Sequence, residues 1–152
     1  ERSGFYRDKD TGIWVMFRPD AIPTDSGDYT DLKTTQSVKW EELRRTIADR
    51  GYHQQLGLIR TGMRVLGFPF SSASLIFVEK KNPWATRVVT LKENHLDVGE
   101  GCNRAALDSM AECLKKNHWP GPGGDREDAE QIEIPDWAAN RAEDRIKFGI
   151  PT

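Results

Sequence analysis

The chain has 152 residues, of which 37% are hydrophobic and 30% are charged. This is the composition of a globular domain, and it excludes a disordered chain. No apolar run approaches the roughly 20 residues of a membrane helix and no secretory leader is evident, so we expect a cytoplasmic protein without a membrane partner. The formal net charge of −2 argues against a strongly basic nucleic-acid binder, but carboxylates that hold metal ions are neutralised when the site is loaded.

The patterns at the start of the chain predict three strands followed by two helices. Residues 4–8 and 13–18 alternate apolar and polar side chains around turn-forming residues at 10–12, which predicts a β-hairpin. A short strand is expected at 29–34. Apolar residues at helical spacing then predict two helices, at 38–50 and 52–66.

Two further strands are predicted at 73–80 and 85–91, and a long helix at 93–117. This helix carries both cysteines, Cys102 and Cys113. Eleven helical residues rise about 16 Å, which excludes a disulfide between them and predicts two reduced thiols. A Pro- and Gly-rich stretch at 120–125, an edge strand at 132–134 and a short final helix from Pro135 complete the chain.

The order of elements, β-β-β-α-α-β-β-α followed by a tail, predicts an α/β fold. We expect one domain over residues 1–152, with a mixed β-sheet flanked by α-helices. Trp40 is expected to be a core residue or a residue that staples the end of a helix, and packing is also the expectation for Trp84.

The residues that suggest chemistry are two acids and a lysine. Asp31 and Lys33 lie two residues apart on a predicted strand, so their side chains point to the same side. Asp20 lies near the end of the preceding strand, and paired strands would bring both carboxylates to one hard cation, with the Leu32 carbonyl as a further oxygen ligand. Such a site provides what phosphodiester hydrolysis needs, because the metal and the lysine stabilise charge on the phosphoryl oxygens.

The acid–x–lysine triplet alone is weak evidence. Average composition predicts about one such triplet by chance in a chain of this length, and an exposed acid–lysine pair is then the ordinary interpretation. The surrounding motifs carry the argument: Arg-Pro-Asp at 18–20, Asp-Leu-Lys-Thr at 31–34, and Tyr-His-Gln-Gln at 52–55. A Trp-Pro pair at 119–120 and Ile-Pro-Asp-Trp-Ala at 134–138 follow in the same order.

Together these motifs resemble the PD-(D/E)XK nuclease superfamily, and within it the exonuclease domain of the RecE-type proteins of prophages. The resemblance implies a restriction-endonuclease-like fold and a magnesium-dependent deoxyribonuclease, with manganese as a possible substitute. Asp20, Asp31 and the Leu32 carbonyl would bind the metal, Lys33 would be the catalytic lysine, and Gln55 would belong to the active site.

The same resemblance implies 5′-to-3′ digestion of linear duplex DNA from its ends. It also implies recombination through a single-strand annealing partner, and assembly into a homo-oligomeric ring around DNA. Contacts to DNA are expected from Thr34, Tyr52, His53 and Arg60, although His53 could equally be a helix-packing residue and charged helix faces are usually only solvated.

The sequence departs from the family at two positions. The family often has a tyrosine four residues after its glutamine, where this chain has Ile59. The family also places another metal-site acid or histidine on a helix upstream of the first hairpin, so we expect the chain to lack such a segment. Two alternatives therefore stay open: a catalytically silent domain that binds DNA or a partner, and a site-specific endonuclease of the same superfamily.

Overall fold

The computed structural model describes residues 2–125 and 128–148. The chain forms two compact units, Glu1–His118 and Trp119–Thr152, and each is described by itself. The boundaries of a single domain over residues 1–152 stay a prediction. The first unit contains β1 (Gly4–Arg7), β2 (Trp14–Phe17), β3 (Asp28–Thr35), α1 (Trp40–Asp49), α2 (Tyr52–Val65), β4 (Ser72–Glu79), β5 (Thr86–Thr90) and α3 (Glu93–Lys116); the second contains α4 (Asp136–Phe148).

The strands form two sheets. The strands β1 and β2 make an antiparallel hairpin, while β3, β4 and β5 form a separate sheet in that order. In this second sheet β3 is parallel to β4, and β4 is antiparallel to β5. The predicted α/β fold with a mixed sheet and flanking helices is therefore confirmed.

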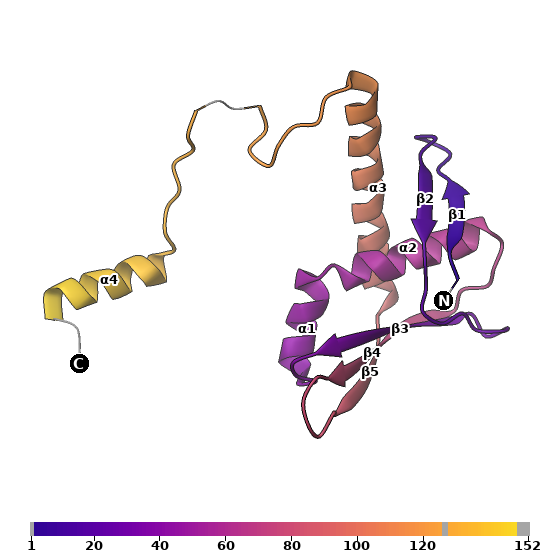
Figure 1. Ribbon diagram of the computed structural model, residues 1–152, viewed down its shortest axis with the longest axis horizontal. Coiled ribbons are helices and arrows are strands. Elements are labelled where there is room, and N and C mark those ends of the chain that lie inside the picture. The colour runs from indigo at the N-terminus through magenta and orange to yellow at the C-terminus, as the bar shows by residue number, and fades with distance from the viewer. Residues whose placement is uncertain (1, 126–127, 149–152) are drawn as a thin grey trace. The chain divides into compact units, whose positions relative to one another are not determined.

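Helix α2 is the central element of the first unit. It packs against α1, α3 and the β1–β2 hairpin, as Figure 1 shows. Its buried residues Leu56, Ile59 and Met63 recur at helical spacing and join strand residues such as Leu75 and Phe77 in one core. This packing sets the position of the first turn of α2, which faces β3.

The hairpin is fitted to α2 through the ring of Phe17, which is 3% exposed. A Cβ atom added at Gly62 on α2 would lie 2.3 Å from this ring, and one added at Gly4 would lie equally close. Only glycine leaves room for the ring at these two positions. The end of β2 is thereby fixed, three residues before Asp20.

Three sequence-based expectations are wrong. Residues 132–134 form no strand. Trp40 is 48% exposed, because it is the first residue of α1, and Leu43 is the residue that this helix buries. Trp84 is 58% exposed in the β4–β5 turn. Both cysteines are free, as expected. In the described part of the chain, no helix has the length and apolar character to span a membrane.

Candidate active site

Asp20 lies beside β3 because the chain after β2 pairs with the free edge of that strand. Ala21 forms an antiparallel bridge with Thr30, and its N–H donates to the Thr30 carbonyl at 3.2 Å. Extending this pairing by one residue sets Asp20 opposite Asp31, and side chains opposite each other in antiparallel strands lie about 5 Å apart at Cβ. The Leu32 N–H donates to Oδ2 of Asp20 at 2.9 Å. The two acids eleven residues apart thus meet, as the sequence predicted.

Asp31 is buried, with only 1% of its surface exposed. Its Oδ2 atom forms an ion pair with Nζ of Lys33, and its Oδ1 atom accepts a hydrogen bond from Nε2 of Gln55 at 3.2 Å. The lysine comes from the same face of β3, two residues on, and the glutamine comes from the first turn of α2. The structure therefore brings together Asp20, Asp31, Lys33 and Gln55.

The electrostatics of Asp31 follow from its surroundings. Burial raises the pKa of the Asp31 carboxyl above its usual range, because the charged form loses its hydration. The Lys33 ammonium opposes this increase and the neighbouring Asp20 carboxylate adds to it. A further cation beside the two acids would favour their charged forms, since opposite charge within a few ångströms lowers a carboxyl pKa.

Lys33 is held from two sides. Besides its ion pair with Asp31, its Nζ atom lies 4.8 Å from the centroid of the Tyr52 ring. A cation over an aromatic face is stabilised by the electrons of the ring. The Tyr52 ring is itself tilted against Phe77 of β4, with centroids 6.2 Å apart. The Lys33 side chain is 18% exposed, so a ligand can reach it from solvent.

The donor set fits a hard divalent cation in part. Oδ2 of Asp31 is buried and has no hydrogen-bond partner among the described residues, although it forms the ion pair with Lys33. The Leu32 carbonyl points to the same strand edge as the Leu32 N–H, where Asp20 lies. Two carboxylates and a carbonyl are ligands that magnesium prefers. Within the described residues, however, no group of three or more His, Cys, Asp or Glu side chains could hold a metal ion.

Comparison with known proteins identifies the family. Residues 1–131 match the family described as PDDEXK-like domain of unknown function (DUF3799). No curated protein matches the chain. The match covers well over half of the sequence. The chain belongs to this PDDEXK-like family.

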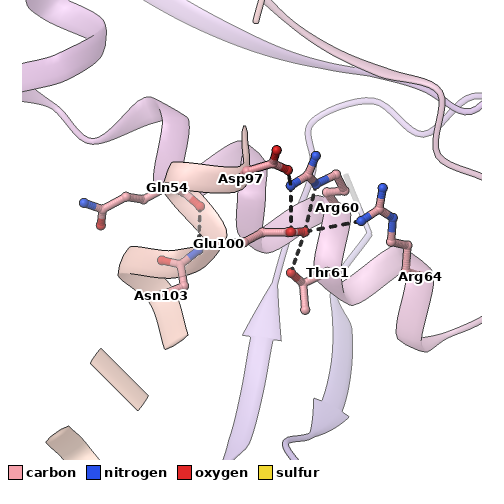
Figure 2. Close-up of polar contacts among 7 residues, drawn as sticks. All are labelled: Gln54, Arg60, Thr61, Arg64, Asp97, Glu100 and Asn103. Carbon is pink, nitrogen blue, oxygen red and sulfur yellow. Dashed lines mark hydrogen bonds and ion pairs between the residues drawn. The ribbon is translucent and has the colours of Figure 1, made fainter. Parts of the chain in front are cut away.

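The first turn of α2 in the PDDEXK-like domain is fixed by a close crossing with α3. A Cβ atom added at Gly99 of α3 would lie 2.1 Å from the His53 carbonyl oxygen, and one added at Gly57 would lie 2.9 Å from the Glu100 nitrogen. Nδ2 of Asn103 donates to the Gln54 carbonyl at 2.8 Å, as drawn in Figure 2. Backbone contact of this kind holds Gln55 in reach of Asp31.

The expectation that Arg60 contacts DNA is corrected by its position. Its side chain is 1% exposed and points into the α2–α3 interface (Figure 2). Its Nε atom donates to Glu100 at 2.8 Å and its Nη2 atom donates to Asp97 at 2.5 Å. A second bond to Glu100, at 2.6 Å, completes a two-pronged pair. An ion-paired guanidinium without solvent access offers no phosphate contact, so Arg60 anchors one helix to the other.

The other three expected DNA contacts lie in different surroundings. Thr34 is exposed on the face of β3 opposite Asp31 and Lys33, so the structure does not bring it to the acids. His53 is half-buried, and its carbonyl lies at the α2–α3 crossing. The Tyr52 ring holds the Lys33 ammonium, a role that the sequence pattern does not reveal.

Proposed function

We propose that this PDDEXK-like domain is a magnesium-dependent deoxyribonuclease that hydrolyses DNA phosphodiester bonds. The observation that carries the proposal is the convergence of Asp20, Asp31, Lys33 and Gln55 from three segments: the loop after β2, strand β3 and helix α2. A pair of acids next to a lysine that is partly exposed and packed over an aromatic ring is an arrangement suited to phosphoryl chemistry. The family resemblance supports the same reaction.

In this proposal Asp20, Asp31 and the Leu32 carbonyl would hold the magnesium ion, and manganese would substitute. Magnesium would supply charge stabilisation at the phosphoryl oxygens. Lys33 would place its ammonium at the same oxygens. Its contacts with Asp31 and the Tyr52 ring would hold the ammonium in that position. Gln55 would orient the Asp31 carboxylate through its hydrogen bond to Oδ1, and so fix the direction of the Oδ2 atom that is paired with Lys33.

The test is cleavage of linear duplex DNA with magnesium by the purified protein. We expect Lys33→Ala to reduce cleavage by at least about 100-fold while the protein stays folded, because removing one group that stabilises transition-state charge typically costs that much. A protein that cleaves no DNA with any divalent ion would overturn the proposal. In that case the catalytically silent alternative would hold.

The resemblance to RecE-type exonucleases supports a more specific proposal: 5′-to-3′ digestion from the ends of linear duplex DNA. The enzyme would act in recombination with a single-strand annealing partner, and would assemble as a ring of identical copies. Covalently closed circular DNA separates this activity from a site-specific endonuclease. An exonuclease leaves the circle intact, since it needs an end, whereas an endonuclease linearises it.

A further inference from the structure

A cavity of about 490 Å³ opens in the first unit beside the strand edge that carries the acids. It is lined by Arg2, residues 22–24, Tyr29 and residues 68–69. Its volume lies in the range of sites that bind small molecules or their parts. None of its lining residues belongs to the set of acids, lysine and glutamine described above.

The position of the cavity follows from the pairing of Ala21 with Thr30. In that register Ile22 lies opposite Tyr29, as Asp20 lies opposite Asp31. Side chains two residues apart on a strand share a face and are separated by about 7 Å along it. The Ile22–Tyr29 pair in the cavity wall therefore lies next to the Asp20–Asp31 pair, on the same face of the paired strands.

The inner wall of the cavity is rigid. Tyr29 is 2% exposed, and its ring stacks on Phe70 with centroids 5.4 Å apart. Its hydroxyl donates to the Pro69 carbonyl at 3.0 Å, so the tyrosine has no free donor to offer a polar ligand. The buried Tyr29 ring therefore supports this wall from within and leaves little of its own surface for a ligand.

The outer wall carries two exposed apolar side chains and has a cation at one side. Phe68 is 54% exposed and Ile22 is 40% exposed. Arg2 is the one charged side chain that lines the cavity in the described part of the chain. An aromatic surface with a nearby guanidinium suits a nucleotide, because bases stack on aromatic rings and arginine binds phosphates.

We propose that this cavity binds a nucleobase of the DNA strand next to the phosphate that is cleaved, with Phe68 as its stacking surface and Arg2 on an adjoining phosphate. The inference rests on the proposed nuclease function. It adds a subsite that grips the strand through any base, since stacking does not depend on sequence.

The experiment measures DNA binding without turnover, in a Lys33→Ala background with magnesium. Linear duplexes carry 2-aminopurine, whose emission reports base stacking, at one of the terminal positions in turn. We expect a change of emission at one position on binding. Phe68→Ala should remove that change and weaken binding by about 5- to 150-fold, the range expected for losing one stacked base. Phe68→Tyr, which keeps the ring, should behave like the parent.

Phe5→Ala is the matched control. Phe5 is 55% exposed, almost the same as Phe68, but it lies on β1 and does not line the cavity. It should leave both binding and emission unchanged. Arg2→Ala should make binding less dependent on salt. The negative slope of log affinity against log salt should become less steep by about 0.9, the effect of losing one phosphate contact on duplex DNA.

The outcomes separate the two proposals. If the wild-type protein cleaves DNA but Phe68→Ala binds with the parent's affinity and emission pattern, the subsite is refuted and the nuclease function stands. If Phe5→Ala weakens binding as much as Phe68→Ala does, stacking in the cavity is also refuted. If the wild-type protein neither binds nor cleaves DNA, both proposals fail.

Discussion

Asp20 and Leu32 are joined by a hydrogen bond of 2.9 Å, from the Leu32 N–H to Oδ2 of the carboxylate. The bond fixes an acid in a loop against the edge of β3, at the residue between Asp31 and Lys33. Asp20 is thus held in place by the backbone, and its charge can serve a ligand.

Because the carboxylate both accepts this hydrogen bond and carries a charge, two substitutions at Asp20 can test the two roles separately. Asp20→Asn keeps an oxygen that can accept the Leu32 bond but removes a charged ligand. We expect cleavage to fall by at least about 100-fold, because several kcal/mol of metal-derived stabilisation is lost, while the melting temperature stays nearly unchanged. Asp20→Ala should lose as much activity and also about 1 kcal/mol of stability, the net worth of a hydrogen bond. Cleavage assays and thermal unfolding measure the two effects.

Asp25→Asn provides the control, since it removes the same charge from an exposed position five residues along the loop. It should keep full activity. Equal losses from both substitutions would mean that the loop needs net negative charge and that Asp20 has no specific role.

Gln55 is expected to matter through the orientation of Asp31. Gln55→Ala removes the 3.2 Å bond to Oδ1 of Asp31 and leaves this buried carboxylate free to turn. We expect metal affinity or activity to fall by about 10- to 100-fold, as is typical for groups that support a ligand. Magnesium titration of the cleavage rate measures the change.

Gln54→Ala tests whether any change in this turn has the same effect. The Gln54 side chain is exposed, and the bond from Asn103 uses the Gln54 backbone carbonyl, which alanine retains. The variant should behave like the wild type. An activity loss in Gln54→Ala equal to that in Gln55→Ala would refute the orienting role.

Part of the site could be predicted from local periodicity in the sequence, and part only from the family resemblance. Asp31 and Lys33 share a face because side chains alternate along a strand. Asp20 was predicted from its position near the end of the preceding strand, and Gln55 only from the resemblance to the nuclease family. The helical spacing of apolar residues predicted α2 and α3 to within about a residue at each end.

The role of Arg60 could not be predicted from its charge, because its burial depends on how closely α3 crosses α2. Gly57 and Gly99 permit that crossing, and spacing alone does not reveal it. One signal was present: Arg60 lies four residues after Leu56 and three before Met63, on the apolar stripe of α2. A charged residue on such a stripe indicates a buried ion pair, and Asp97 and Glu100 supply it.

The ion pair between Asp8 and Arg104 makes stability depend on pH. The Arg104 guanidinium donates to Asp8 at 2.8 Å and holds the pKa of that carboxyl at about 2, below its usual 3.8. Because the folded-state pKa is lowered, the stabilisation is fully present above about pH 4 and is lost as the pH falls toward 2. The Asp8 side chain is 12% exposed, so about 2 kcal/mol is expected from this shift.

Asp8→Asn removes the titrating group. Between pH 4 and pH 2 its free energy of unfolding should fall by about 2 kcal/mol less than that of the wild type, which denaturant titration at several pH values measures. Parallel curves for the two proteins would show that the Arg104 pair does not perturb Asp8.

The last prediction concerns the crossing that places the first turn of α2. Alanine at Gly99 would bring its Cβ atom to 2.1 Å from the His53 carbonyl oxygen, so the two helices must move apart. We expect a loss of about 1–3 kcal/mol of stability, as for other overpacked sites, and reduced cleavage because Gln55 leaves Asp31.

Gly101→Ala is the control, because it lies on the same helix with nothing within 4 Å of the new Cβ atom. It should gain about 0.5–1 kcal/mol, the usual preference of a helix for alanine, with cleavage unchanged. Denaturant unfolding and cleavage assays of the two variants measure these opposite effects, and equal stability would mean that the helices do not approach as closely as the structure has them.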